Sequence, residues 1–379
     1  MNEWKKVSLD QMGTVSRGKS KHRPRNDARL FGGKYPFIQT GDIGSAGLYV
    51  NEFSQTYNEE GLAQSKLWEK DTLCITIAAN IADTALLAFP ACFPDSIMGF
   101  VADPKISNVK FVKYCFDILQ RDCKQISQGA AQDNLSWKKL STIEFPCPPI
   151  EVQHRIATIL SRYDSLIENY QKQIKLLEEV AQRLYKEWFI DLRFPGHENT
   201  NLIDGVPEGW EKKKVGEIAP IITGKKDANF GTPNGEYPFF TCSQEPIKAP
   251  SFSFDCAAVI LAGNGDFNVK LYRGKFEAYQ RTYVLSPYCA QHLYLLYYTI
   301  SANMTKLAAG SSGSTIKFLT KGMIDGINLN IPNDEILRSF NKKVEPIQSS
   351  RESLQSQLRL LTEARDRLLP KLMSGEITV

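Results

Sequence analysis

The stretch that decides the fold is residues 149–193, which read PIEVQHRIATILSRYDSLIENYQKQIKLLEEVAQRLYKEWFIDLR. Apolar side chains recur in it with a 4-3-4-3 spacing, which is typical of a helix that packs along a second helix. The seam consists of Ile156, Leu160, Tyr163, Ile167, Tyr170, Ile174, Leu177, Ala181, Leu184 and Trp188. Because such a face must be buried, these residues are predicted to form one long helix beside a partner helix.

The partner helix and a C-terminal tail are predicted at residues 332–379, because the seam recurs there with a displacement of 184 residues. The corresponding positions are Phe340, Val344, Ile347, Arg351, Leu354, Leu358, Leu361, Arg365, Leu368 and Leu372. Two of them are arginine, so the second helix is expected to differ from the first in its docking of partners or in the register of its contacts. If a two-fold axis relates the copies, the helices run antiparallel as a rod of about 60 Å for 40 residues.

The repeat extends over the rest of the chain. Residues 34–38, KYPFI, are matched by residues 236–240, EYPFF, and the tryptophan near the start of the chain, Trp4, is matched by Trp210. The part of each copy before the helix contains short apolar and aromatic runs broken by Gly, Pro, Asn and Asp, which predicts strands and loops. We therefore expect an α+β fold with an internal pseudo-two-fold repeat. Two similar strand-rich domains, residues 1–148 and 210–331, are separated by two antiparallel helices that form a coiled-coil rod, and residues 194–209 form a linker.

The composition is that of an ordinary globular protein, with 42% hydrophobic and 23% charged residues. No apolar run approaches the roughly 20 residues that span a bilayer, and the N-terminus lacks a signal-peptide pattern, so a cytoplasmic location is expected. The eight cysteines form no C-x-x-C pair and there are only four histidines, which predicts buried thiols and no metal site. The net charge of +4 is too small to indicate a nucleic-acid partner by itself.

Residues 13–20, GTVSRGKS, match the phosphate-loop pattern G-x-x-x-x-G-K-[ST]. That chemistry needs a buried strand before the loop and a helix after it, so that backbone amides face the phosphates. Neither is evident in the flanking residues. A nucleotide hydrolase remains as an alternative, in which Lys19→Ala abolishes nucleotide binding.

The same segment belongs to a basic cluster that has an echo in the second copy. Its members are Arg17, Lys19, Lys21, Arg23 and Arg25, and the echo is Lys225 and Lys226. Alternating cations in a Gly- and Pro-containing loop favour a surface that meets phosphates over a merely solvated loop. Polar residues of nearby loops are the candidates for contact with base edges, although such residues often only form turns. They are Gln39, Thr40, Asp42, Asn80, Gln132, Asn134, Thr241, Ser243, Gln244 and Asn264.

Three strings resemble one known family, the specificity subunits of type I restriction-modification enzymes, and the resemblance covers nearly the whole chain. Residues 148–157, PPIEVQHRIA, are similar to the family's proline-proline, glutamine, arginine, isoleucine, alanine entry into its central helix. Residues 206–210, VPEGW, resemble the opening of the second recognition domain, and the Gly- and Ser-rich residues 310–315 resemble the loop before the second rod helix. Residues 332–338, PNDEILR, depart from the pattern because they lack the paired proline and the glutamine.

The resemblance implies a subunit without catalytic residues, cofactor or metal of its own. Residues 1–148 and 210–331 would be target-recognition domains that each read half of a split, asymmetric site in double-stranded DNA, and the rod would set the gap. The apolar seam residues would pair the helices and dock two methylation subunits, which supply S-adenosylmethionine and flip the target adenine. Motor-nuclease subunits that use ATP and Mg²⁺ can join. The alternatives are another restriction-modification type, an orphan subunit, or a coiled-coil scaffold without nucleic-acid contact.

Overall fold

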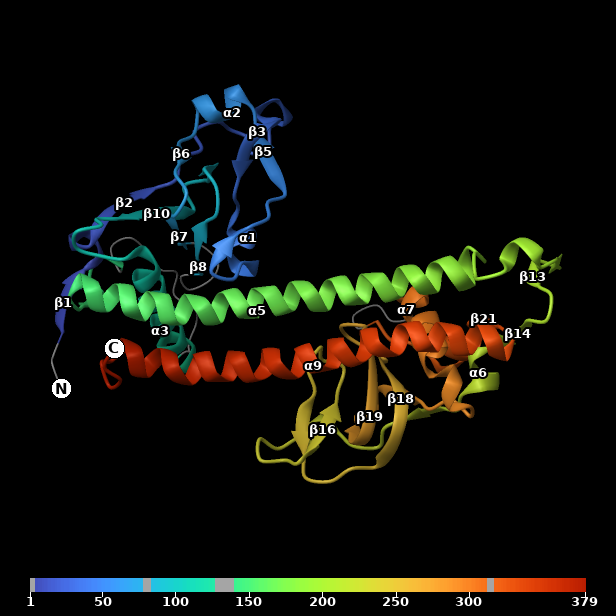
Figure 1. Ribbon diagram of the computed structural model, residues 1–379. Helices are drawn as coiled ribbons and strands as arrows, with labels where there is room; N and C mark the ends of the chain where they lie inside the picture. The colour runs from blue at the N-terminus through green and yellow to red at the C-terminus, as the bar shows by residue number, and fades with distance from the viewer. Residues whose placement is uncertain (1–3, 78–82, 127–139, 312–316) are drawn as a thin grey trace. The chain divides into compact units, whose positions relative to one another are not determined.

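The computed structural model describes residues 4–77, 83–126, 140–311 and 317–379, with only the backbone for residues 121–126. The chain divides into two compact units (Figure 1). The first comprises residues 1–172 and 354–379, and the second residues 173–353. Each unit therefore contains one strand-rich domain together with a part of both long helices.

The domain of the first unit contains two sheets. In the first sheet the strand order is β2 (Gly13–Arg17), β10 (Ile97–Ala102), β7 (Leu73–Thr76), β8 (Thr84–Leu87) and β4 (Tyr49–Val50). In the second the order is β5 (Gln55–Tyr57), β3 (Phe31–Phe37), β9 (Ala91–Cys92) and β6 (Leu67–Trp68). Strand β7 is buried along its whole length, because it has a neighbouring strand on each side and packed side chains on both faces. Short helices α1 (Thr40–Ser45) and α2 (Glu59–Ala63) join these strands.

Helix α3 (Val109–Ile126) connects this domain to the long helices α5 (Ile150–Tyr185) and α9 (Asp334–Met373). Phe111 and Phe116 of α3 belong to one core cluster with Ile156 and Leu160 of α5 and with Leu369, Leu372 and Met373 of α9. Early residues of α5 thus pack with late residues of α9, so the two helices are antiparallel in this unit. Strand β1 (Lys5–Ser8) pairs with β11 (Glu144–Cys147) directly before α5 begins.

The domain of the second unit is built around one sheet of six strands. Their order is β15 (Ile221–Thr223), β20 (Thr282–Leu285), β18 (Phe254–Ala262), β19 (Val269–Ala278), β16 (Tyr237–Phe240) and β17 (Ile247–Ala249). Helix α7 (Leu293–Gly310) packs on this sheet, and its Tyr298 shares a core cluster with Tyr185 of α5 and Phe340 of α9. Strand β14 (Glu211–Lys214) pairs with β21 (Asn328–Ile331), the counterpart of the β1–β11 pair. The helices α6 (Val215–Ile218) and α8 (Lys321–Asp325) and the hairpin β12 (Leu202–Ile203) and β13 (Val206–Pro207) complete the unit.

The expected internal repeat is confirmed at the level of secondary structure. Corresponding elements begin 184 residues apart: α3 and α7 at 109 and 293, β11 and β21 at 144 and 328, and α5 and α9 at 150 and 334. One difference lies in the sheets, because the continuous strand β19 of the second unit corresponds to the separate strands β8 and β9 of the first. The predicted α+β plan of two strand-rich domains and two long antiparallel helices is thus correct.

All twenty seam positions are buried or half-buried along the two helices, whereas Leu166, Leu176 and Val180 lie outside the seam and are exposed. The arginines at positions 351 and 365 are accommodated because each forms an ion pair with an acidic residue of α5. The α-helix predicted for residues 149–193 ends at Tyr185 and continues as a π-turn, Lys186–Ile190. The predicted linker contains the β12–β13 hairpin and is therefore not without structure.

The cysteine prediction was wrong in part. Cys74, Cys92 and Cys115 are buried, and burial raises the pKa of the Cys74 thiol. Cys289 is exposed because it lies in the surface loop before the short helical turn Ala290–His292. None of the helices among the described residues combines the length and apolar character that a membrane span requires.

Candidate nucleic-acid interface

The basic segment of the first domain has a backbone that is fastened at several points. The N–H groups of Gly18 and Lys19 donate to the carbonyl oxygens of Ile97 and Phe93, at 2.8 and 3.0 Å. The N–H groups of Lys21 and His22 both donate to Oε1 of Gln64, at 2.6 and 3.0 Å. The segment is therefore held between the β9–β10 turn and the end of α2, which gives the side chains on it defined starting points.

Three cations of this segment point into solvent. Arg17, Lys19 and Lys21 are exposed and form no ion pair within the described residues. Nearby, Lys66 donates to Oγ of Ser16 at 3.4 Å and lies over the Trp68 ring, 3.5 Å from its centroid. A fixed backbone that carries unneutralised cations is the arrangement expected of a surface that meets phosphates.

Arg23 and Arg25 of the cluster, and the neighbouring Arg29, have carboxylate partners within the same domain. Arg25 forms an ion pair with Asp95 at 2.5 Å, and Arg23 lies 3.8 Å from the same carboxylate. Arg23 also donates to the carbonyl oxygen of Ser20 at 2.7 Å. Arg29 forms an ion pair with Asp27 at 2.8 Å, and its hydrogen bonds hold the pKa of the Asp27 carboxyl well below its usual range. The cluster, which looks uniform in the sequence, therefore consists of three cations without an ion pair among the described residues and two arginines beside Asp95.

The phosphate-loop alternative was wrong. Gly13 begins strand β2, which pairs along its whole length with β10, so residues 13–17 form a strand instead of a loop. A Cβ at Gly13 would collide with the carbonyl oxygen of Val101, which explains the glycine by strand packing. No helix follows, because the next regular element is the short turn Ala28–Leu30. The nucleotide-binding geometry is therefore absent from this described segment.

The candidate base readers of the first domain lie around the start of α1. Gln39 is exposed and its Nε2 donates to Oε1 of Gln55 at 2.7 Å. Thr40 is half-buried as the first residue of α1, and Oδ2 of Asp42 accepts from the N–H of Gln39 at 2.7 Å. Asp42 thus caps the helix in this structure. Three further candidates, Asn80, Gln132 and Asn134, lie outside the described residues, as does most of the Gly- and Ser-rich loop at 310–315.

In the second domain, three chain segments meet at one end of the six-stranded sheet. The N–H of Gly224 donates to the carbonyl oxygen of Thr282 at 3.1 Å, and the N–H of Gln280 donates to that of Lys226 at 2.9 Å. The N–H of Gly263 donates to the carbonyl oxygen of Arg281 at 2.8 Å. Two of the predicted phosphate contacts lie here: Lys225 is exposed, and Nζ of Lys226 lies 4.4 Å from the centroid of the Phe230 ring.

The predicted readers of this domain surround the same end of the sheet. Nε2 of Gln244 donates to Asp266 at 2.9 Å, and Nζ of Lys270 donates to the carbonyl oxygen of Ser243 at 2.8 Å. Oγ1 of Thr241 accepts from the N–H of Ser243 at 3.3 Å. Asn264 forms an isolated β-bridge with Phe318. The four candidates therefore come from two loops that belong to one surface region.

Sequence reasoning missed a cavity of about 320 Å³ in this region. It is lined by Thr223, Gly263, Gln280, Arg281, Tyr283, Phe318 and Leu319. Arg281 is exposed and forms no ion pair among the described residues, and an arginine beside aromatic rings can both stack on a base and donate to its edge. The repeat offered a signal, because Arg281 occupies the turn between β19 and β20 that corresponds to the Asp95 turn of the first domain.

Gly18 and Gly224 occupy equivalent places in the two domains. A Cβ at Gly18 would collide with the carbonyl oxygen of Pro94, and one at Gly224 with that of Ala278. Both glycines therefore allow the chain that carries the cations to approach the neighbouring turn. Within the described residues, no group of three or more His, Cys, Asp and Glu side chains is arranged to hold a metal ion.

Comparison with known proteins places the whole plan in one family. The family model described as the type I restriction modification DNA specificity domain matches residues 1–179 and 207–350. The EcoDI specificity subunit of Escherichia coli is 37% identical over 177 residues, which are 46% of this chain and 40% of that subunit. The MjaIX specificity subunit of Methanocaldococcus jannaschii is 26% identical over an alignment of 414 positions, covering 100% of this chain and 94% of that subunit.

A solved structure shares the fold. The S subunit of a type I restriction-modification system from M. genitalium superposes with a TM-score of 0.66 at 17% identity, covering 97% of this chain and 96% of the other. The chain thus spans less than half of the length of the EcoDI subunit but nearly the full length of the MjaIX and M. genitalium proteins. Since the two matched segments of the family model include both domains and the start of both long helices, the chain belongs to the family of type I restriction-modification DNA specificity proteins.

Proposed function

We propose that this chain is the DNA-reading subunit of a type I restriction-modification enzyme and that each domain reads one half of a bipartite site. The observation that carries the proposal is that each domain has an equivalent segment in which cations lie next to a glycine, residues 17–21 in the first domain and 224–226 in the second. Backbone hydrogen bonds fasten each segment to a neighbouring turn. Cations on a fixed backbone position a domain on the phosphates, and residues beside them contact the bases.

The two domains would read different sequences. In the first domain the turn beside the cations carries Asp95, which engages Arg25, whereas the corresponding turn of the second domain carries Gln280 and Arg281 beside a cavity. Base contacts depend on which donors and acceptors reach the groove, so unlike turns favour unlike half-sites. The site is therefore asymmetric in sequence, although the two domains share one plan.

The rest of the enzyme lies in other subunits under this proposal. The paired long helices set the gap between the half-sites and dock two methylation subunits, which bind S-adenosylmethionine and flip the target adenine. Restriction subunits add ATP- and Mg²⁺-dependent cleavage. The chain itself holds no cofactor and catalyses nothing, and the assembly works on DNA in the cytoplasm.

The experiment is to reconstitute the chain with the methylation subunits and to map the methylated adenines in DNA that the complex has modified. A split sequence with a constant gap supports the proposal, and random methylation or none contradicts it. Five exposed or half-exposed cations, Arg17, Lys19, Lys21, Lys225 and Lys226, also predict a logarithmic salt slope of about −4.5 for DNA binding, at roughly −0.9 per phosphate.

The same reconstitution separates the other roles that this architecture could serve. ATP-driven cleavage after addition of restriction subunits distinguishes a type I enzyme from another restriction-modification type or an orphan subunit. A coiled-coil scaffold would retain no DNA even with the methylation subunits present.

A further inference from the structure

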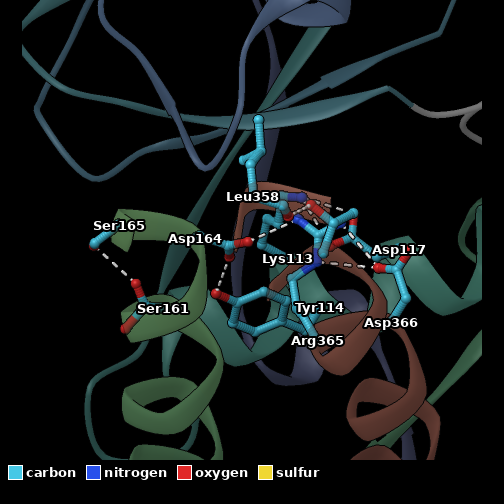
Figure 2. Close-up of polar contacts among 10 residues, drawn as sticks. Lys113, Tyr114, Asp117, Ser161, Asp164, Ser165, Leu358, Arg365 and Asp366 are labelled. Atoms are coloured by element: carbon cyan, nitrogen blue, oxygen red, sulfur yellow. Dashed lines mark hydrogen bonds and ion pairs between the residues drawn. The ribbon is translucent and has the colours of Figure 1, made fainter. Parts of the chain in front are cut away.

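A carboxylate of α5 joins three helices in the first unit (Figure 2). Oη of Tyr114, on the domain helix α3, donates to Oδ2 of Asp164 at 2.5 Å. Nη1 of Arg365, on α9, donates to Oδ1 of the same carboxylate at 2.9 Å. The Tyr114 residue is only 1% exposed and the Asp164 side chain 11% exposed, so this connection is shielded from water.

The second unit contains a connection of the same kind. Oη of Tyr297, on the domain helix α7, donates to Oε1 of Glu178 at 3.4 Å. Arg351 of α9 forms an ion pair with Glu178 of α5 and donates to Oη of Tyr297 at 3.0 Å. Again a tyrosine of the domain, an acid of α5 and an arginine of α9 meet, with 10% of the Arg351 side chain and 21% of the Glu178 side chain exposed.

The internal repeat does not relate these two triads to each other. With the displacement of 184 residues, Asp164 corresponds to Gln348 and Arg365 to Ala181, while Glu178 corresponds to Thr362 and Arg351 to Ile167. In both units the acid nevertheless lies on α5 and the arginine on α9. Tyr114 and Asp164 themselves correspond to Tyr298 and Gln348, whose side chains are also hydrogen-bonded, so the tyrosine contact of the first triad has a counterpart in the second unit. The full connection of a domain tyrosine, an acid of α5 and an arginine of α9 is nevertheless made in the two units at positions that the repeat does not relate.

Apolar packing alone would hold each domain against its helices. A buried ion pair adds little net stability, because the loss of hydration offsets the attraction between the charges. What it adds is direction, since hydrogen bonds weaken steeply as the donor, hydrogen and acceptor depart from a line and a misaligned pair would leave charges buried without partners. Apolar side chains, in contrast, tolerate small rotations of one surface over the other.

Further charges lie beside the first triad. Lys113 and Asp117 of α3 form an ion pair at 2.7 Å, and Arg365 also pairs with Asp366 at 2.9 Å (Figure 2). Asp117 is packed close to the triad, and burial raises the pKa of its carboxyl. Each of these two ion pairs lies within one helix, whereas the hydrogen bond from Tyr114 to Asp164 joins α3 to α5.

We propose that Tyr114–Asp164–Arg365 and Tyr297–Glu178–Arg351 are positioning triads that fix the orientation of each recognition domain on its own stretch of the paired helices. They thereby decide how strictly the complex accepts one spacing between half-sites. The part that concerns spacing rests on the proposed function, whereas the part that concerns orientation does not.

The first test needs no DNA. In the full chain, nitroxide labels are attached to cysteines that replace the exposed Lys70 and Arg162, while Cys123, Cys147, Cys242, Cys256 and Cys289 are replaced by serine. Pulsed electron paramagnetic resonance then gives the distribution of distances between domain and helix α5. We expect one narrow distribution for the parent chain and a broadened or shifted one for Tyr114→Phe, which removes only the hydroxyl.

The second test uses the complex with the methylation subunits and duplexes that carry the mapped site with its spacer unchanged or altered by 1 bp. Tyr114→Phe should weaken the preference for the natural spacer by about fivefold to tenfold, while affinity for that spacer stays within about twofold. The matched control is Tyr35→Phe, which removes a 2.9 Å hydrogen bond to Glu59 inside the first domain and should leave both measurements unchanged. Tyr297→Phe repeats the spacer test in the second unit and serves if Tyr114→Phe does not fold.

Each outcome has a definite meaning. Unchanged distances together with an unchanged spacer preference in the folded Tyr114→Phe chain overturn the positioning role in the first unit, and an unchanged spacer preference in the folded Tyr297→Phe chain overturns it in the second. A parent complex that shows no sequence-specific binding overturns the proposed function, and the distance measurement still decides the inference about orientation.

Discussion

Nη1 of Arg365 lies 2.9 Å from Oδ1 of Asp164, so a seam position that periodicity assigns to an apolar contact holds an ion pair between α9 and α5. The two residues are 201 positions apart in the chain. Because Asp164 also accepts from Tyr114, neither charge can be removed without consequence for the other groups.

Removing one partner of this ion pair should lower the free energy of unfolding more than removing both partners together. Arg365→Leu leaves the Asp164 carboxylate, whose side chain is 11% exposed, without its cation, and should lower the free energy of unfolding by about 2–3 kcal/mol. The triple variant Arg365→Leu, Asp164→Leu, Tyr114→Phe should recover most of that loss, because no buried polar group is left unpaired. The measurement is urea denaturation.

A matched control lies two residues further along α9. Arg367 pairs with Glu363, but the side chains are 78% and 45% exposed, so Arg367→Leu should change stability by less than about 0.5 kcal/mol. Equal losses for Arg365→Leu and Arg367→Leu would contradict the distinction between buried and exposed pairs.

The free cations of the first domain should be distinguishable from the paired ones by salt dependence. Lys19→Ala and Lys21→Ala should each make the logarithmic salt slope of DNA binding less steep by about 0.9, because each removes one phosphate contact. Arg29→Ala should leave the slope unchanged, since Asp27 already neutralises that cation at 2.8 Å. The measurement is fluorescence anisotropy of the complex from low to moderate salt. A salt-independent complex would contradict the phosphate role of the whole cluster.

Arg281 should affect base preference in one half-site only. Its place at the cavity of the second domain predicts that Arg281→Ala costs about 1–3 kcal/mol of discrimination at a single base pair there, with the other half-site unaffected. The measurement is competition binding with duplexes substituted at each position. The control is Arg338→Ala, which removes an exposed arginine of α9 that pairs with Asp334. A uniform loss of affinity on all sequences would instead make Arg281 a phosphate contact.

Deleting matched heptads from the two helices tests whether the paired helices set the gap between the half-sites. Residues 166–172 of α5 and 357–363 of α9 lie between the two positioning triads, so their joint removal keeps both triads intact. The rod should shorten by about 10 Å, which is about three base pairs, and the gap in the methylated sequence should shrink accordingly. Deletion from α5 alone should instead destabilise the chain, because it puts one seam out of register with the other. An unchanged gap after the joint deletion would remove the helices from gap selection.

His292 predicts a dependence of stability on pH. Burial, reinforced by the charge of Lys213 and opposed by that of Asp334, lowers the pKa of His292 from its ordinary value of 6.5. The folded chain then holds fewer protons than the unfolded chain, so this contribution is fully present above pH 6.5 and is lost as the pH falls through the folded-state pKa. Urea denaturation between pH 7.5 and about 5 should show a decline that His292→Gln reduces. The same decline in that variant would assign the effect to other groups.

The repeat and the two long helices could be predicted because they are patterns along the chain. A seam that keeps its spacing from Ile156 to Trp188 needs no knowledge of the partner, and the 184-residue displacement is a comparison of the sequence with itself. The end of α5 could not be predicted in this way, because the π-turn at Lys186–Ile190 lies in the buried aromatic cluster around Phe189, Trp210 and Phe340.

The basic cluster shows where sequence reasoning stops. Arg17, Lys19, Lys21, Arg23 and Arg25 alternate without a break, yet only the first three are free of ion pairs among the described residues. The difference is made by Asp95, which is 70 residues from Arg25 in the chain and reaches it only because β2 and β10 are paired. The phosphate-loop motif at residues 13–20 likewise does not form a nucleotide-binding loop, because Gly13 begins a strand.

The sequence by itself determined the duplicated plan, the two seams and the family, because these are carried by spacing and by local strings. Only the tertiary structure decided which cations are available, that Arg281 borders a cavity, and that the two arginines of the second seam meet acids of the first helix. Those facts depend on pairs such as Arg351 and Glu178, which lie 173 residues apart, and long-range contacts of single side chains leave no periodic trace in the chain.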